Sequence, residues 1–560
     1  MTLKKPNLIF SAFKSALIQF AIWIALTSVP FAAYSQDLLR VGFLQKDFPA
    51  SFSIDQKSRQ KAASQIILPL VYSSLWVLGP GPEYSALPGL AHKWETEDRK
   101  TWQFSLIPGA TFSDDSIVDA DDVVFSLKFQ ANLGEAWKER NIEVLSVEKL
   151  DQNTVEVVLK EGYSGSYPPF YRIPILPQHV WQNVRGTTRF TNEHAIGSGP
   201  YKVESFVKDE SIHLIKREPQ TGISAKYEQL VFKAFANSNL LHEALKAGEI
   251  DIFGHDGILP ATLSSFEETE GISAVVTEGI ELHWLSFNLA KGNAINDIRI
   301  RKAIMTAINR KKIIAAVYRG YAKPIDSIIY SELADYYPSP GKYDFDIEKA
   351  KRILDHAGYT DSNFDGTRDD RTSNQDLAFS LMLLNTNKHH VEMGKLIKEQ
   401  LEAIGIQINL MKVTPFVYFS FLKNPLGGGY DIALNSGSPG PVLVADIWKM
   451  MKSDEDLKNE YNSSHYINYA FDQLLRKMRT TADYSRRSKY LQLMQKIMHD
   501  DLPYGVLLRP YVINPVRNKD FHGFSKAMGG ISSEINVWSY VEQNEVEVEK
   551  EGTGLFNFLN

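Results

Sequence analysis

The segment 283–321 constrains the fold more than any other part of the chain. Residues 283–289 alternate between two faces as a strand does, and a polar loop follows them. Asp297 then stands where a helix N-cap belongs, and Gly320 stands where a helix ends. Between them one buried helical face is predicted by Ile300, Ala303, Ile304, Ala307 and Ile308. The segment therefore predicts a strand that enters a domain, followed by one long helix that packs on it.

The same alternation of strands and helices continues downstream. Apolar spacing predicts a helix over 343–359, a strand over 379–384, a helix over 389–404 and strands over 406–410 and 430–434. Strands that alternate with helices in this way are typical of an α/β domain. Two more helical patterns lie within 470–498, and a strand is predicted over 507–516.

Several short motifs occur in a fixed order along the chain. They are Leu90–Glu95 (LAHKWE), Ala110–Asp115 (ATFSDD), Gly197–Tyr201 (GSGPY), Ala244–Asp251 (ALKAGEID), and the series Asn288, Asp297, Arg301, Ala303, Ala307, Ile308 and Arg310. In this order they resemble the motifs of the family 5 extracellular solute-binding proteins, the peptide-binding receptors of bacterial ABC importers. The resemblance covers residues from about 40 to 540.

The resemblance implies an α/β fold of the periplasmic-binding-protein type II-like kind, with two large lobes joined by a hinge and an inserted smaller domain. The expected divisions are a signal peptide 1–35, lobe I from 36–67, 192–283 and 511–541, domain II over 68–191, lobe III over 284–510, and an acidic disordered tail over 542–560. It also implies closure of the lobes around a peptide or peptide-like solute, and delivery to the permease subunits of an inner-membrane ABC importer.

The N-terminus has the order of a secretory signal peptide. Lysines precede the apolar stretch Leu17–Leu26, and the small residues Ala33 and Ser35 predict cleavage before Gln36. The chain contains no cysteine, so a lipid anchor on a cleavage-site cysteine is not expected. A formal net charge of −6 without a basic run argues against nucleic acid as a partner. We expect a periplasmic, monomeric protein.

No pattern for a catalytic centre is present. The chain lacks the G-x-S-x-G, H-E-x-x-H and dinucleotide-binding motifs, so we predict that it is not an enzyme. Three alternatives stay open at this point: a receptor for a metal chelate or a sugar, a hydrolase built on the same scaffold, and a sensor that presents its ligand to another membrane partner.

The predicted ligand-binding residues come partly from the residues and partly from the resemblance. In peptide-binding relatives, an aspartate in the loop after the strand at 430–434 holds the free amine of the peptide. Here that loop reads Asn435–Gly440 (NSGSPG) and contains no acid, so it offers backbone groups instead. The full predicted set is Ser53, Asp55, Trp284, Phe287, Asn288, Tyr430, Ser436, Gly437, Ser438 and Trp448.

One acidic loop has the spacing of a calcium-binding loop. Asp361, Asn363, Asp365 and Asp369 match ligand positions 1, 3, 5 and 9, and Gly366 matches position 6. Position 12 is Thr372 rather than the usual bidentate glutamate. Two interpretations stay open, a structural calcium site or a polar turn built by Asx side chains. No other cofactor is expected.

Overall fold

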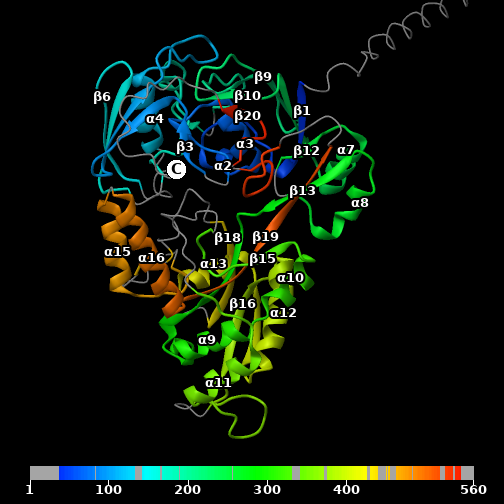
Figure 1. Cartoon of the computed structure of the whole chain (residues 1–560). Coiled ribbons are helices and arrows are strands. Elements are labelled where there is room, and N and C mark those ends of the chain that lie inside the picture. Colours follow the sequence, from blue (N-terminus) through cyan, green and yellow to red (C-terminus); the bar gives the residue numbers. More distant parts are fainter. Residues whose placement is uncertain are drawn as a thin grey trace, which may run out of the picture.

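The computed structural model describes residues 37–81, 84–132, 142–163, 167–187, 190–254, 257–330, 341–370, 375–424, 429–438, 450, 452–453, 462–481, 483–517, 524–533 and 536–543. Within them the chain forms an upper and a lower part, joined by strands that run between the two (Figure 1). The upper part holds lobe I and domain II, and the lower part is lobe III. The α/β fold class predicted above is confirmed.

Lobe I is built on one half of a twelve-stranded sheet, in which β1 lies between β11 and β12 and is parallel to both. Its strands are β1 (Leu38–Leu44), β8 (Tyr201–Val207), β9 (Ser211–Lys216), β11 (Gln229–Phe235), β12 (Ile252–Phe253) and β13 (Ile272–Glu278), with the pair β10 (Ile223–Ala225) and β20 (Val541–Gln543) beside them. Its helices are α2 (Gln56–Arg59), α3 (Ala62–Val71), α6 (Gln178–Trp181), α7 (Ser238–Ala247) and α8 (Ser264–Glu267).

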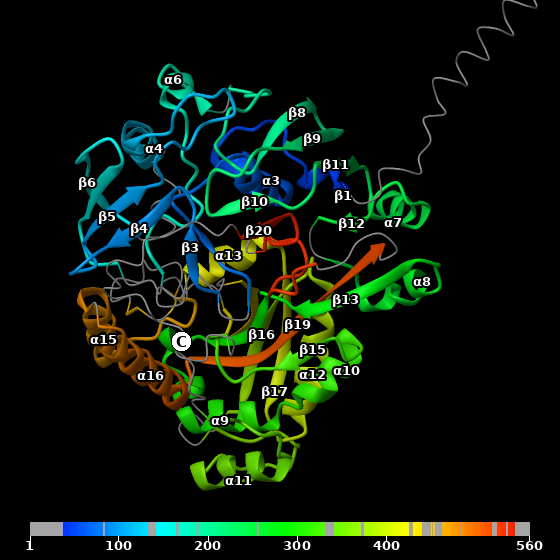
Figure 2. The same cartoon turned by 45° about the horizontal axis from the view of Figure 1, so that its top comes forward.

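Domain II is a four-stranded antiparallel sheet in the order β4-β5-β7-β6, with a helix packed against β6 and β7 (Figure 2). Its strands are β4 (Ala91–Glu95), β5 (Thr101–Leu106), β6 (Val144–Lys149) and β7 (Thr154–Leu159), preceded by the hairpin of β2 (Trp76–Leu78) and β3 (Ala86–Pro88). The helix is α4 (Ala120–Asn132). Side chains along β5 alternate between the two faces of the sheet, and Trp102, Phe104 and Leu106 all point into the core.

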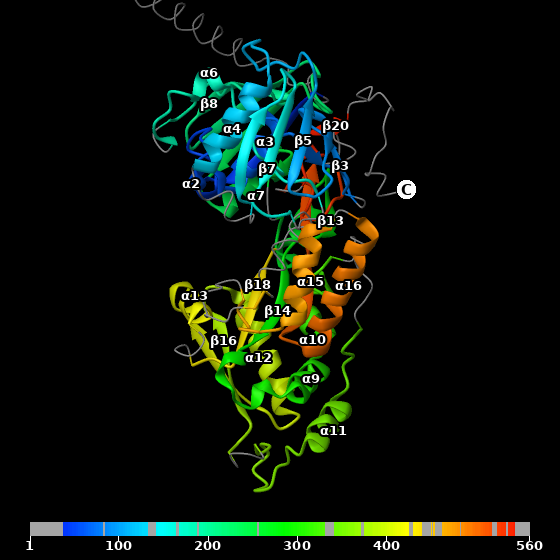
Figure 3. The same ribbon diagram turned by 90° about the vertical axis from the view of Figure 1, so that its left-hand side faces the viewer.

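Lobe III carries the other half of the large sheet, in the order β17-β16-β18-β14-β19. Its strands are β14 (Leu282–Phe287), β15 (Ala322–Pro324), β16 (Ala378–Leu384), β17 (Gln407–Val413), β18 (Ile432–Gly437) and β19 (Tyr504–Arg517). Its helices are α9 (Ile298–Ala307), α10 (Arg310–Tyr318), α11 (Ile347–Ala357), α12 (Lys388–Glu402), α13 (Pro415–Lys423), α15 (Tyr469–Thr480) and α16 (Tyr484–Asp501). The last two pack together along one side of the lobe (Figure 3).

The long helix expected after Asp297 is two helices. Asp297 does cap the first one, since its side chain accepts a hydrogen bond from the Arg299 backbone N at 2.8 Å. Ile308 then takes an extended conformation, and the Asn309 side chain caps α10 through the Lys312 backbone N at 2.9 Å. Asparagine is among the best N-cap residues, so Asn309 restarts the helix within the apolar pattern.

The domain boundaries in the structure differ from the predicted ones at three places. The boundary between 67 and 68 would cut α3, whose buried residues on both sides pack into the core of lobe I. Trp181 of α6 joins the same core, although domain II was expected to continue to 191. Glu542 and Gln543, placed in the disordered tail, belong to β20 and pair with β10. Burial of apolar side chains, rather than position in the chain, decides each assignment.

Candidate functional site

The strands β14 and β18 pair along their length, and the start of β14 and the end of β18 lie at the end of lobe III that faces the upper part of the molecule. Trp284 of β14 lies opposite Asn435 of β18, and its side chain joins the apolar cluster that also holds the core of domain II. Leu285 and Phe287 point to the other face of the sheet and pack into lobe III. The alternation of the sequence therefore separates a face toward domain II from a face toward the core of lobe III.

Gly437 lies close to the indole ring of Trp284. A Cβ atom added at Gly437 would come within 3.2 Å of the Trp284 Cη2 atom, which is tighter than most real contacts of this type. Gly437 ends β18 opposite Leu282, and the exposed Ser438 follows it. A side chain at 437 would therefore crowd the edge of the indole ring, and glycine avoids this contact.

A chain of hydrogen bonds between uncharged side chains fixes this end of β18. The Asn435 Nδ2 atom donates to the Ser286 Oγ atom at 2.7 Å, and the hydroxyls of Ser286 and Ser463 are 2.8 Å apart. The Tyr418 hydroxyl lies 2.7 Å from both the Asn435 Oδ1 atom and the Leu434 carbonyl oxygen, so its single hydrogen faces two acceptors. Burial raises the pKa of Tyr418 above its usual range, so this hydroxyl stays protonated and donates.

One edge of β18 is paired over only part of its length. The ladder with β16 covers Ile432 and Ala433, whereas the ladder with β14 continues from Ile432 to Gly437. No described strand pairs with residues 434–437 on the side of β16. Main-chain groups on an open strand edge can hydrogen-bond an extended chain without reading its side chains.

Trp284 also carries a polar atom that nothing described satisfies. Its side chain is buried, with 8% of the residue exposed, and its Nε1 atom has no hydrogen-bond partner within the described residues. A buried donor without a partner is uncommon in native proteins and calls for an explanation. The indole N–H of Trp284 therefore remains available for an acceptor outside the described residues.

Three of the predicted ligand contacts are part of the interior of lobe III. Phe287, Asn288 and Tyr430 are fully buried, and Phe287 packs in the hydrophobic core. The Asn288 Nδ2 atom donates to the Tyr430 carbonyl at 3.1 Å, and the Asn288 backbone N donates to the Asp431 carbonyl at 2.9 Å. The prediction of direct ligand contact does not fit this placement, because these side chains join β14 to β18 below the surface.

The two predicted contacts of lobe I have local partners. The Ser53 hydroxyl is buried and donates to the Thr187 carbonyl at 2.7 Å. The Asp55 carboxylate accepts hydrogen bonds from the backbone N and the hydroxyl of Ser58, at 3.2 and 2.7 Å. Asp55 thus stabilises the turn that begins α2. Trp448 lies outside the described residues, so its prediction is unchanged.

The acidic loop at 361–369 is held together by its own side chains. The Asp361 carboxylate accepts hydrogen bonds from the backbone N atoms of Asp365 and Gly366, at 3.2 and 3.0 Å. The Asp369 carboxylate accepts from the Ser362 backbone N at 2.7 Å and from its hydroxyl, and these bonds lower the pKa of Asp369. Within the described part of the chain, no three His, Cys, Asp or Glu side chains are grouped as metal ligands.

One buried acid that holds the lobe III sheet together was not predicted from the sequence. Asp431, buried just before β18, accepts hydrogen bonds from the Lys291 Nζ atom at 3.0 Å, the Asn293 Nδ2 atom at 2.8 Å and the Ser380 backbone N at 2.8 Å. It therefore joins the loop after β14 to β16. The partners of Asn435 were overlooked as well; only Ser286, on the same strand face as Trp284, carried a signal in the sequence.

A separate small cavity lies inside lobe III. It is lined by Met305, Arg310, Asp326, Tyr343 and His499, among others, and has a volume of about 30 Å³. A cavity of this size holds one or two water molecules and no peptide. It is distinct from the end of β18.

Comparisons with known proteins agree with this architecture. Residues 86–458 match the family model described as bacterial extracellular solute-binding proteins, family 5 middle. The chain is 24% identical to the dipeptide-binding protein of Escherichia coli K12 over 78% of this chain and 83% of that protein. It is 28% identical to the oligopeptide-binding protein AppA of Bacillus subtilis, over 74% of this chain and 76% of that protein.

The fold is also shared with solved structures. NikA from Brucella suis, solved in complex with Fe(III)-EDTA, superposes with a TM-score of 0.74 at 20% identity, over 90% of this chain and 100% of that chain. The family match over more than half of the chain, together with the shared fold, shows a solute-binding protein. The chain belongs to the bacterial extracellular solute-binding proteins of family 5. Among the helices in the described residues, none is both long and apolar enough to cross a membrane.

Proposed function

We propose that this protein is a periplasmic receptor that binds peptides or peptide-like solutes between its lobes and delivers them to an ABC import permease. The observation that carries the proposal is the end of β18 at Ser436 and Gly437, which pairs with β14 but with no described strand on the side of β16, beside the unsatisfied indole N–H of Trp284. An extended peptide offers alternating carbonyl and N–H groups, which suit both features. The names of the relatives, dipeptide-binding and oligopeptide-binding, support the same class of ligand.

In this function the protein acts by binding alone. The candidate site contains hydroxyl, amide and indole groups from Ser286, Asn435, Ser436 and Trp284. Hydrogen bonds within the protein hold the side chains of Ser286 and Asn435. No nucleophile with an adjacent base is present among them, which supports a receptor rather than a hydrolase. The receptor would reach the periplasm through a signal peptide at 1–35 and act there as a monomer.

Native mass spectrometry of the protein purified from periplasmic extract tests the proposal. We expect adducts with a spread of masses that fragment into amino-acid sequences. Titration of the stripped protein with a casein digest should change its tryptophan fluorescence and raise its melting temperature. The variant Trp284→Phe keeps the aromatic packing but lacks the indole N–H, and we expect it to bind the same peptides more weakly. A protein that carries no peptide and responds to none contradicts the proposal.

A metal chelate is the second candidate, because a solved relative holds Fe(III)-EDTA. A chelate of this kind is anionic and needs cationic or polar groups that surround it. Elemental analysis together with the native mass spectrum separates the two candidates. One defined metal-containing mass favours the chelate, whereas a metal-free mixture of peptide masses favours the receptor for peptides.

A further inference from the structure

The two connections between the lobes lie side by side. β13 of lobe I pairs with residues 511–517 of β19, and β14 of lobe III pairs with residues 504–508 of the same strand. The chain therefore passes between the lobes at 279–281 and again at 509–510. The Gly279 backbone N donates to the Pro510 carbonyl at 2.9 Å, so the two crossings touch each other. Figure 1 shows β13 and β19 where the upper and lower parts of the molecule meet.

Arg509 binds the other crossing from the middle of β19. Its Nη1 atom lies 2.9 Å from the Glu278 Oε2 atom, and its Nε atom donates to the Gly279 carbonyl at 2.5 Å. Only 1% of Arg509 is exposed. A guanidinium is always charged, and a buried one requires partners in a fixed geometry. The charge of Arg509 therefore holds Glu278 and Gly279 against β19.

Two further side chains complete this cluster. The ring of Tyr330 stacks with the Arg509 guanidinium, whose Cζ atom is 4.7 Å from the ring centroid, and the Tyr330 hydroxyl donates to the Ile280 carbonyl at 2.7 Å. Lys323 of β15 forms a second ion pair with Glu278, and β15 itself pairs with residues 508–510. The last residue of β13, Glu278, and the first two residues of the crossing, Gly279 and Ile280, are thus bound to the second crossing and to lobe III.

We propose that Arg509 is the positioning residue of the hinge. It holds 278–280 and 509–510 together as one rigid unit, so that the lobes move about a single axis and the ligand-free protein occupies a narrow range of lobe separations. Cation–π and charge-assisted contacts that are out of water are among the stronger side-chain interactions. Without them, the two crossings would bend independently. This inference concerns the hinge itself and does not depend on which solute the cleft binds.

The test measures lobe separation in the stripped, ligand-free protein. The chain has no cysteine, so two cysteines introduced at the exposed positions Lys208 in lobe I and Lys311 in lobe III carry spin labels without background. Double electron–electron resonance should give one narrow distance distribution for the otherwise unchanged protein. In Arg509→Met the distribution should broaden and shift. In Tyr330→Phe, which keeps the stacked ring and removes the hydroxyl, it should broaden less.

The matched control is Arg40→Met. Arg40 forms an ion pair with the buried Asp251 inside lobe I, away from the hinge. We expect this variant to lose thermal stability while it keeps the original distance distribution. An unchanged distribution in both Arg509→Met and Tyr330→Phe overturns the inference and leaves Arg509 with a role in stability alone. Because no ligand is present, this outcome is independent of whether peptide binding is found.

Discussion

The Nε2 atom of His283 lies 2.9 Å from the hydroxyl of Tyr318 in the interior of lobe III. The ring of His390 packs against the His283 ring, with 5.6 Å between the centroids. The His283 Nδ1 atom and both ring nitrogens of His390 have no hydrogen-bond partner within the described residues. Two adjacent, buried imidazoles with so few acceptors around them are stable only in the neutral form.

These histidines predict a loss of stability in acid. Burial lowers the pKa of His283 from 6.5 to about 3 and that of His390 to about 4. The charge of Glu281 opposes this shift in the pKa of His390, whereas the neighbouring His389 adds to the shift for both histidines. The unfolded chain therefore takes up protons first as the pH falls below 6.5. The contribution of the two histidines should be complete above that pH and decline down to about 4 for His390 and about 3 for His283.

Thermal unfolding between pH 7 and pH 4.5 measures this decline. Each histidine contributes a slope of up to about 1.4 kcal/mol per pH unit in this window. The variant His390→Leu removes one imidazole and leaves an apolar side chain in its place. We expect a shallower pH dependence for this variant. An equal slope in both proteins would mean that other groups cause the acid loss.

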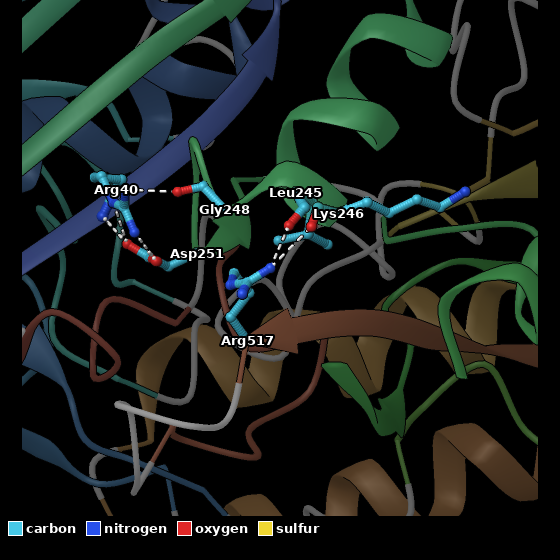
Figure 4. Close-up of polar contacts among 6 residues, drawn as sticks. All are labelled: Arg40, Leu245, Lys246, Gly248, Asp251 and Arg517. Carbon is cyan, nitrogen blue, oxygen red and sulfur yellow. Dashed lines mark hydrogen bonds and ion pairs between the residues drawn. The ribbon is translucent and has the colours of Figure 1, made fainter. Parts of the chain in front are cut away.

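Arg40 and Asp251 join the first strand of lobe I to the end of α7. The Arg40 Nη2 and Nε atoms lie 2.6 and 2.9 Å from the Asp251 carboxylate, and the Nη1 atom donates to the Gly248 carbonyl at 2.7 Å (Figure 4). Arg517, at the end of β19, donates to the Leu245 carbonyl at 3.1 Å. We expect Arg40→Met to lower the free energy of unfolding by about 3 kcal/mol, because Asp251 would stay buried with its charge uncompensated.

Urea unfolding followed by circular dichroism checks this value. The double variant Arg40→Met with Asp251→Asn should lose less than the sum of the two single losses, since neither charge is then left alone. Additive losses would show that the two side chains act independently.

Gly437 predicts a steric effect on ligand binding. A valine there would press on the indole ring of Trp284, because even a Cβ atom would come within 3.2 Å of the Cη2 atom. Overpacking of about 1–3 kcal/mol at the site corresponds to a loss of affinity of about 5- to 150-fold. Ser438→Ala, at an exposed position, removes at most one neutral hydrogen bond of about 0.5–1.5 kcal/mol.

Calorimetry with a peptide identified from the purified protein compares the two variants. We expect Gly437→Val to bind much more weakly than Ser438→Ala. The loop Asn435–Gly440 contains no acidic side chain. Acetylation of the peptide's free amine should therefore have little effect on the affinity of the unchanged protein or of either variant. Full affinity in Gly437→Val would remove this end of β18 from the site, and a large loss on acetylation would point to an acid such as Asp55 or Asp446.

The N-terminus predicts a shorter mature chain. The order of lysines, the apolar stretch Leu17–Leu26 and the small residues before Gln36 should direct export and cleavage. N-terminal sequencing of the protein from periplasmic extract should begin at or near Gln36. Recovery of the protein only in the membrane fraction with Met1 present would contradict this prediction.

The acidic loop at 361–369 should be stable without metal. The carboxylates of Asp361 and Asp369 already accept hydrogen bonds from the backbone of the loop. We therefore expect EDTA to leave the melting temperature unchanged. A decrease that added calcium reverses, and that Asp365→Asn abolishes, would instead establish the calcium site that the spacing allows.

The sequence determined the local features of this protein. The alternation in β14 assigned Trp284 and Phe287 to opposite faces, and Asp297 marked a helix start, because both depend on residues close in the chain. The restart of the helix at Asn309 was missed for a related reason. The apolar spacing continues through Ile308, so only the conformation of that residue separates α9 from α10.

The long-range contacts were decided by the tertiary structure. Nothing local relates Arg509 to Glu278, more than two hundred residues earlier, or Asn435 to Ser286; each pair is brought together by the register of β19 and β18 against their neighbours. The strand and loop at 430–440 were expected to form part of a ligand site from the family resemblance, and this stays a prediction. Pairing between distant strands decides which side chains face outward and which form hydrogen bonds inside the sheet. A local sequence pattern does not contain this information.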